Sequence, residues 1–112
     1  MSLARNNLRI QKRASIFAAL GDPTRLKLVG ELSQGQAKSI KSLSDGAKIT
    51  RQAITKHLRV LEDVGLVQNV KQGRESLFEL NPKPLREVEE ALQYYASQWD
   101  QALMNLKNFV EE

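Results

Sequence analysis

The segment of residues 50–67 constrains the fold most, because it combines the period of a helix with a defined start and a defined end. Thr50 suits an N-cap, since its side-chain oxygen can accept a hydrogen bond from a backbone N–H of the first turn. Apolar residues follow with spacings of four and three, which places them on one side of a helix: Ile54, Leu58 and Leu61. Gly65 suits the left-handed conformation that often follows a helix. The segment therefore predicts an amphipathic helix that packs on a core through one face.

The other face of this predicted helix carries basic and hydrogen-bonding side chains first and acidic ones last. Its first polar side chains are Arg51, Gln52, Thr55, Lys56 and Arg59. Glu62 and Asp63 come only at the C-terminal end, where the helix macrodipole makes negative charge unfavourable. The N-terminal half is therefore kept clear of anions. Such a face can be an ordinary solvated surface, or it can bind a polyanion.

Three helices are expected before this one. Residues 6–20 have apolar residues at mostly helical spacing, and Gly21 suits the left-handed position after that helix. Asp22 suits the N-cap of a second helix. The buried stripe of the second helix is expected to be Leu26, Val29 and Leu32. Residues 39–49 predict a short third helix, with Gly46 near its end.

Two strands and a long helix are expected after it. Residues 67–70 and 76–80 predict short strands, joined by a turn in which Gly73 can adopt a positive φ. From residue 82 onward, apolar residues repeat with alternating spacings of three and four, the pattern of a helix that lies along another helix. The fold class is therefore mainly α with a small β-hairpin, in the order α-α-α-α-β-β-α. The chain is expected to form a single domain, residues 1–112.

The composition excludes several kinds of site. With no cysteine, the chain has no disulfide, thiolate metal site or cysteine nucleophile. No nucleophile–base pair, phosphate-binding loop or cluster of metal ligands is visible, so we expect no catalytic residues, no metal and no cofactor. No apolar run is long enough to cross a membrane and no secretion signal is visible, so we expect a cytoplasmic protein without a membrane partner. The single histidine, His57, could lie at the boundary of the core, contact a DNA backbone or bind a metal.

The charge distribution favours a polyanionic partner. The net charge is +4 and the pI is about 9.6. Basic residues outnumber acidic residues 14 to 7 in residues 1–81, whereas acidic residues outnumber basic ones 6 to 3 in residues 82–112. The cationic part of the chain thus includes the helix after Thr50 and the turn with Lys71 and Arg74, and a basic surface attracts nucleic acid.

A short helix, a turn and a second helix with an exposed polar N-terminal half form the arrangement of a helix-turn-helix. The second helix of that motif enters the DNA major groove with its N-terminal residues, where arginine can bind guanine and glutamine can bind adenine. The basic hairpin would act as a wing that contacts phosphate or the minor groove. The helix-turn-helix and wing are predicted to span residues 36–81. The predicted DNA-binding residues are Thr50, Arg51, Gln52, Thr55, Lys56, Arg59, Lys71 and Arg74.

The long apolar face of the last helix predicts a homodimer interface, to which the first helix contributes. Its predicted residues are Ile10, Ala14, Phe17, Leu92, Tyr95, Trp99, Leu103 and Leu106. The dimerisation helices are then residues 1–20 and 82–112. Two alternatives remain open: this face could be the core of a single chain, or its aromatic side chains could line a pocket for an effector.

Three segments of the chain agree with one known family in their order and spacing. They are FAALGDPTRLKLVGEL (17–32), TRQAITKHLRVLEDVGLV (50–67) and VKQGRESLFEL (70–80). Together they resemble the ArsR-type winged helix-turn-helix repressors of bacteria and archaea. The resemblance implies a homodimer built on the first and last helices, a double-stranded DNA operator with two-fold symmetry, and transcriptional repression. Residues 50–64 match the recognition helix of that family, and residues 67–80 match its wing.

The departures from this family concern metal sensing. Many relatives bind thiophilic metals through cysteines on the third helix, where this chain has Ser39 and Lys41. Others bind zinc through histidines and carboxylates on the last helix, which here has no histidine. The chain therefore resembles the subset without metal sensing, and the resemblance identifies no effector. An alternative function is a winged-helix module that binds a partner protein through its last helix.

Overall fold

The structure is a computed structural model, and it describes residues 3–111. Residues 1, 2 and 112, which belong to the predicted dimerisation segments, lie outside the described part. The helices are α1 Leu3–Leu20, α2 Pro23–Leu32, α3 Ile40–Ala47, α4 Arg51–Asp63 and α5 Pro82–Glu111, and the strands are β1 Lys38–Ser39, β2 Val67–Gln72 and β3 Glu75–Leu80. The predicted order of helices and hairpin is confirmed, with β1 added. None of the helices within residues 3–111 is both long and apolar enough to span a bilayer.

The three strands form one antiparallel sheet in the order β1-β3-β2. Strands β2 and β3 pair along their whole length, and β1 adds a short third strand through Lys38 opposite Phe78 and Ser39 opposite Leu77. A strand of two residues is too short to show an alternation of apolar and polar residues. Its pairing depends on where the end of α2 lies relative to the sheet. This is why β1 was not predicted.

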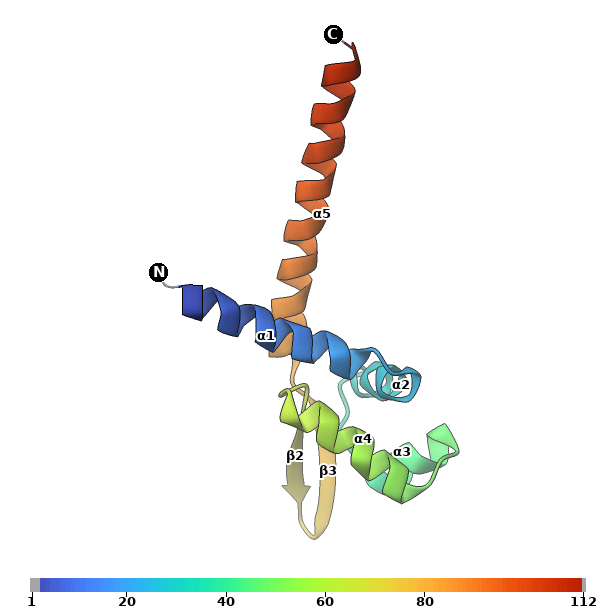
Figure 1. The fold of residues 1–112 in the computed structure, drawn as a ribbon. Helices are drawn as coiled ribbons and strands as arrows, with labels where there is room; N and C mark the ends of the chain where they lie inside the picture. Colours follow the sequence, from blue (N-terminus) through green and yellow to red (C-terminus); the bar gives the residue numbers. More distant parts are fainter. Residues whose placement is uncertain (1–2, 112) are drawn as a thin grey trace.

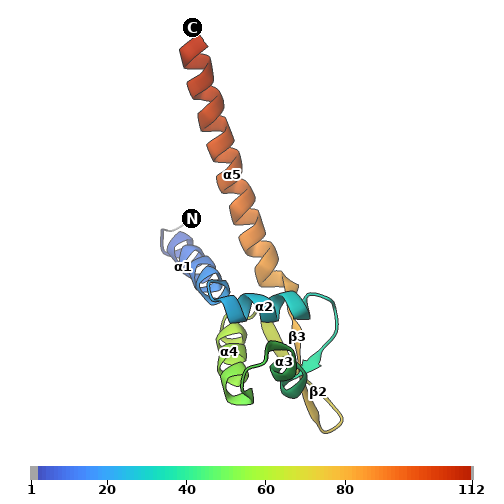
Figure 2. The same ribbon diagram turned by 90° about the vertical axis from the view of Figure 1, so that its right-hand side faces the viewer.

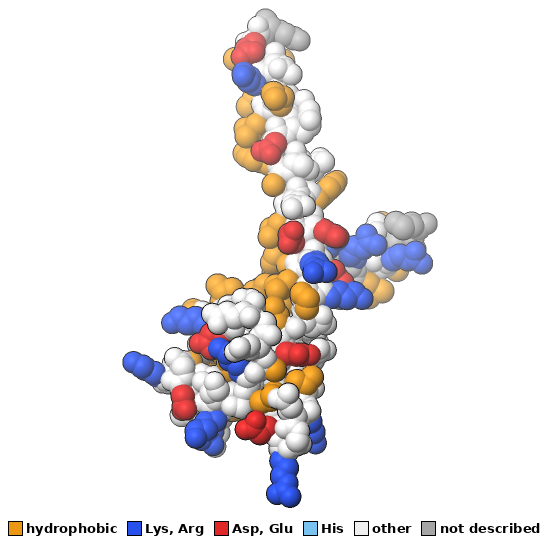
Figure 3. Space-filling model, turned by 180° about the vertical axis from the view of Figure 1, so that it is seen from behind, with side chains coloured by type: hydrophobic (Ala, Val, Ile, Leu, Met, Phe, Trp, Pro, Cys, Tyr) orange, Lys and Arg blue, Asp and Glu red, His pale blue; other side chains and the backbone are white. Residues whose placement is uncertain are grey.

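Helix α5 makes the molecule elongated. Helices α1 to α4 and the sheet form a body, from which α5 projects on the side opposite the β2–β3 hairpin (Figures 1 and 2). The radius of gyration is 18.6 Å, and the longest extent is 68 Å. A compact domain of this length has a radius of gyration of about 13 Å. Hydrophobic side chains lie along the projecting part of α5 (Figure 3).

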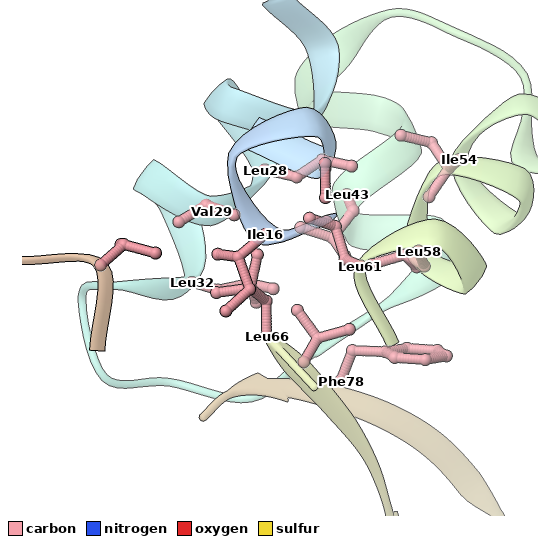
Figure 4. Close-up of a cluster of buried hydrophobic side chains, with 13 residues drawn as sticks. Ile16, Leu28, Val29, Leu32, Leu43, Ile54, Leu58, Leu61, Leu66 and Phe78 are labelled. Atoms are coloured by element: carbon pink, nitrogen blue, oxygen red, sulfur yellow. The ribbon is translucent and has the colours of Figure 1, made fainter. Parts of the chain in front are cut away.

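The core lies where the first four helices meet the sheet (Figure 4). The inward residues predicted for α4 are confirmed, because Ile54, Leu58 and Leu61 are each at most 1% exposed. They pack in one cluster with residues from every other helix and from the hairpin: Ile16, Ala19, Leu28, Val29, Leu32, Leu43, Leu66, Val67, Phe78 and Val88. The recognition helix predicted from the sequence is therefore held on the body by a fully buried face.

The predicted buried stripe of α2 was wrong at Leu26, which is 57% exposed. Leu28 is buried instead, together with Val29 and Leu32. At about 100° per residue, Leu26 and Leu28 lie roughly 200° apart around the helix, so they cannot face the same core. The choice between them depends on the orientation of α2, which is set by tertiary packing.

The predicted role of Gly21 was also wrong. The glycines with positive φ are Gly35, Gly65 and Gly73, so Gly21 does not take the left-handed conformation. Instead its backbone N–H donates to the carbonyl of Ala18, and the chain passes directly to the N-cap of α2. Gly46 lies near the end of α3, as predicted, and Lys48 after it is left-handed, with a φ of 58°.

Candidate nucleic-acid interface

The turn between α3 and α4 is fixed by hydrogen bonds from Ser44. The hydroxyl of Ser44 donates to the carbonyl of Ile49, and the carbonyl of Ser44 accepts from the backbone N–H groups of Lys48 and Ile49. Ser44 is only 7% exposed. The sequence analysis did not identify this residue, because a serine in a short helix has no signal that separates a buried position from a solvated one.

Thr50 begins α4 as predicted. Its hydroxyl accepts from the backbone N–H of Ala53 at 3.1 Å, and its backbone is extended. This bond satisfies one of the N–H groups that lack a partner at a helix start. At the other end, Gly65 has a φ of 79° and Leu66 donates its N–H to the carbonyl of Leu61. Both ends of α4 are therefore defined by local chemistry.

The polar face of α4 presents long side chains that have no protein partner. Arg51, Gln52, Lys56 and Arg59 are exposed, and their side chains make no hydrogen bond or ion pair within residues 3–111. No acidic residue lies in the first turn. These groups can provide forked or single N–H donors to a ligand without breaking an existing contact.

Thr55 differs from its neighbours. Its hydroxyl donates to the carbonyl of Arg51 at 2.7 Å, and the residue is half-buried. The hydroxyl hydrogen is therefore used within the helix, and the methyl group and the remaining acceptor capacity of the oxygen are left for a ligand. Both threonines among the predicted DNA-binding residues thus have a structural role in α4.

The β2–β3 hairpin carries two of the predicted residues to its tip. Gln72 pairs with Glu75, which leaves Gly73 and Arg74 as a two-residue turn. Gly73 has a φ of 65°, the feature of a type II′ turn with glycine at its first central position. Arg74 and Lys71 are exposed and unpaired in the described part of the chain. The paired strands are longer than predicted, so the turn is at the end of a stiff hairpin.

The hairpin and α4 share one side of the molecule. Both lie on the side of the body away from α5, and Lys and Arg side chains mark the tip of the hairpin (Figures 1 and 3). A long polyanion that passes across this side could contact the face of α4 and the hairpin together. The structure thus brings together the two basic elements that are separated in the sequence.

His57 lies on the other edge of α4, at the boundary of the core. Its side chain is 24% exposed, and its Nδ1 lies 3.3 Å from Nη1 of Arg25 and 3.8 Å from Oδ2 of Asp22. The boundary interpretation is therefore confirmed. No group of three or more His, Cys, Asp or Glu side chains in residues 3–111 is arranged to hold a metal ion.

Asp22 is the N-cap of α2 and faces the same cluster. Its carboxylate accepts from the backbone N–H groups of Thr24 at 2.9 Å and Arg25 at 3.0 Å. The bond from the N–H of Arg25 lowers the pKa of Asp22 most. Burial opposes this by raising the pKa, and the charges of Arg25 and His57 and the N–H of Thr24 lower it further. The carboxylate is thus stabilised in its ionised form.

The predicted dimer-interface residues are all exposed in the single chain. On α5 only Pro84, Val88 and Ala91 are buried, and every described residue after Ala91 is exposed. Trp99 is 64% exposed and Tyr95 is 53% exposed. The other predicted positions share this exposure: Ile10, Ala14, Phe17, Leu92, Leu103 and Leu106. This face is therefore not the core of one chain, which rules out that alternative.

These features define a winged helix-turn-helix protein, and comparisons with known proteins identify its family. A family model described as a helix-turn-helix domain matches residues 20–69. The HTH-type transcriptional regulator YuzN of Bacillus subtilis is 40% identical over 80 residues, which are 66% of this chain and 87% of that protein. The solved structure of an ArsR-like transcriptional regulator from Rhodococcus sp. RHA1 is 36% identical in sequence and has a TM-score of 0.80. The match covers 89% of this chain and 93% of that chain.

A more distant structure shares the fold. It is the homodimeric winged helix-turn-helix DNA-binding domain Mb0332 from Mycobacterium bovis, which is 18% identical in sequence and has a TM-score of 0.69. The match covers 91% of this chain and 93% of that chain. The chain belongs to the ArsR family of winged helix-turn-helix transcriptional regulators. This is a family of DNA-binding regulators and not of enzymes.

Proposed function

We propose that the chain is a homodimeric repressor that binds a specific double-stranded DNA operator and senses no metal. The observation that carries the proposal is the N-terminal half of α4. Its exposed polar side chains make no hydrogen bond or ion pair in the part of the chain that the structure describes, and its opposite face is fully buried. A helix held in this way can enter a major groove without rearrangement of the body.

The side chains of this surface divide into two roles. Arg51 and Gln52 lie in the first turn, where the recognition helix meets base edges, and they have the forked donors and acceptors that distinguish base pairs. Lys56 and Arg59 lie further along α4 and suit phosphates. Arg74 at the hairpin tip suits phosphate or the minor groove. The DNA-binding region is then residues 36–81.

The homodimer is built on α1 and α5, within residues 1–20 and 82–112. The part of α5 after Ala91 is an exposed helix of 20 described residues, whereas most helices in proteins are stabilised by packing of their apolar face. A second copy of the chain would cover its apolar face, as the homodimeric relative from Mycobacterium bovis suggests. Two-fold symmetry would place the recognition helices about 34 Å apart, in successive major grooves of a symmetric operator.

Independence from metals is supported by the side chains available. The chain has no cysteine, and α5 offers only carboxylates, which form weak and unselective sites for transition metals. Repression follows from the family resemblance, since a bound dimer would block access to the DNA it covers. The protein would act in the cytoplasm, where the DNA is.

Selection of bound duplexes from a random library tests the proposal. We expect enrichment of one sequence with two-fold symmetry, and a steep loss of affinity with salt, about 10³-fold or more between 50 and 200 mM for six to ten phosphate contacts. A chain that is not retained on any duplex at low salt would instead support the protein-interaction module, which needs only the exposed face of α5.

A further inference from the structure

Arg25 joins three separate parts of the chain. Its Nε donates to the carbonyl of Ala19 in α1 at 2.7 Å, and its backbone N–H donates to the carboxylate of Asp22 at 3.0 Å. Its Nη1 lies 3.3 Å from Nδ1 of His57 in α4. The guanidinium therefore connects α1, a dimerisation helix of the proposed function, with α4, its recognition helix.

The contact between Arg25 and His57 requires one protonation state of the ring. A guanidinium has only N–H donors, so this contact is a hydrogen bond in the tautomer of His57 whose Nδ1 accepts and whose proton is on Nε2. A doubly protonated ring has no acceptor and places a second positive charge against Arg25. The carboxylate of Asp22 also lies near Nδ1, at 3.8 Å.

We propose that Arg25 and His57 are positioning residues that set the angle of α4 relative to α1. The inference rests on the proposed function, because in a dimer built on α1 and α5 this angle sets the separation of the two recognition helices. A changed angle spoils the fit to a fixed half-site spacing but leaves the attraction to phosphate. Affinity for the selected sequence therefore depends on this contact, and affinity for random DNA does not.

A set of four variants separates positioning from charge. His57→Ala removes the acceptor, whereas His57→Gln keeps an amide oxygen that can accept from Arg25 at any pH. Arg25→Ala removes the donor. Lys27→Ala is the matched control, since Lys27 is an exposed cation on the same helix and its side chain makes no hydrogen bond or ion pair within the described residues.

At pH 8, we expect Arg25→Ala and His57→Ala to lower affinity for the selected sequence about tenfold or more, the typical effect of losing a hydrogen bond to a charged group. His57→Gln and Lys27→Ala should stay within about threefold of the unmodified chain, as should all four variants on random DNA.

Two results would overturn the inference. The first is specific affinity in Arg25→Ala and His57→Ala equal to that of Lys27→Ala. The second is an equal loss of affinity for random DNA in these two variants, since a change in the angle of α4 leaves the attraction to phosphate. Hydrogen exchange of the α4 amides provides a readout without DNA: it should rise in Arg25→Ala and His57→Ala but not in His57→Gln. If exchange rises while the unmodified chain binds no DNA, the proposed function fails and the positioning role stands.

Discussion

Replacing Trp99 with alanine should dissociate the proposed homodimer without unfolding the single chain. Trp99 is 64% exposed, so about 160 Å² of a side chain of roughly 250 Å² is accessible in one copy. Burying half to all of this area stabilises a dimer by about 2–4 kcal/mol per copy, at about 25 cal/mol per Å². Because each dimer contains two copies, its dissociation constant should rise about 1,000-fold or more.

Sedimentation equilibrium over a concentration series measures this change directly. Tyr94 provides a matched control, since it is an aromatic residue of α5 with a similar exposed fraction of 60% that lies outside the predicted apolar stripe. Tyr94→Ala should change the dissociation constant by less than about tenfold. The helix content of Trp99→Ala at concentrations that keep it dimeric should match that of the unmodified chain.

Equal effects of the two substitutions would refute the reasoning. An unchanged dimer in Trp99→Ala would mean that the stripe through Trp99 is not the interface. A chain that is monomeric at every concentration before substitution would contradict the assignment of α5 to a second copy. In both cases the exposed face of α5 would need another occupant.

The remaining predictions concern the DNA surface, the core and acid stability. Arg51→Ala should relax selection at one or two base pairs, at a cost of about 1–3 kcal/mol there, whereas Arg74→Ala should weaken binding to all sequences about equally. Repeating the selection with each variant measures this difference. The same uniform loss of affinity for both variants would contradict the division of roles. Leu58→Ala should lower the free energy of unfolding, measured with denaturant, by about 2–5 kcal/mol, because Leu58 is 1% exposed. A decrease of less than about 1 kcal/mol would contradict its place in the core. The pKa of Asp22 is lowered mainly by the N–H of Arg25. The ionised carboxylate of Asp22 therefore stabilises the fold above the unfolded-chain pKa of 3.8, and this stabilisation is lost as the pH falls through the lower pKa of the folded chain. Asp22→Asn should therefore reduce the loss of thermal stability between pH 7 and pH 3, and an unchanged loss would contradict this sign.

Local chemistry made α4 predictable from the sequence. The cap at Thr50, the apolar spacing and the stop at Gly65 each depend on residues within one or two helical turns, and the structure shows all three. The same holds for the hairpin turn at Gly73. By contrast, β1 pairs with residues about 40 positions away, and the exposure of Leu26 depends on how α2 is oriented. No local pattern encodes those choices.

The sequence predicts which side chains form the candidate surface but not the hydrogen bonds that hold it in place. The sequence identified which polar side chains share the outer face of α4, because a helix fixes that face once its inner face is known. It did not show that Thr55 bonds to its own helix or that Ser44 anchors the turn. The contact of Arg25 with His57 joins residues 32 positions apart and appears only when α2 packs on α4.

Methylation protection of guanine N7 on a selected duplex tests most directly whether two copies of α4 enter successive major grooves. We expect two protected patches, related by two-fold symmetry, with centres about 10 base pairs apart. Arg51→Ala should remove protection at equivalent guanines in both patches. A single patch, or tight binding without any protection in the major groove, would contradict the account.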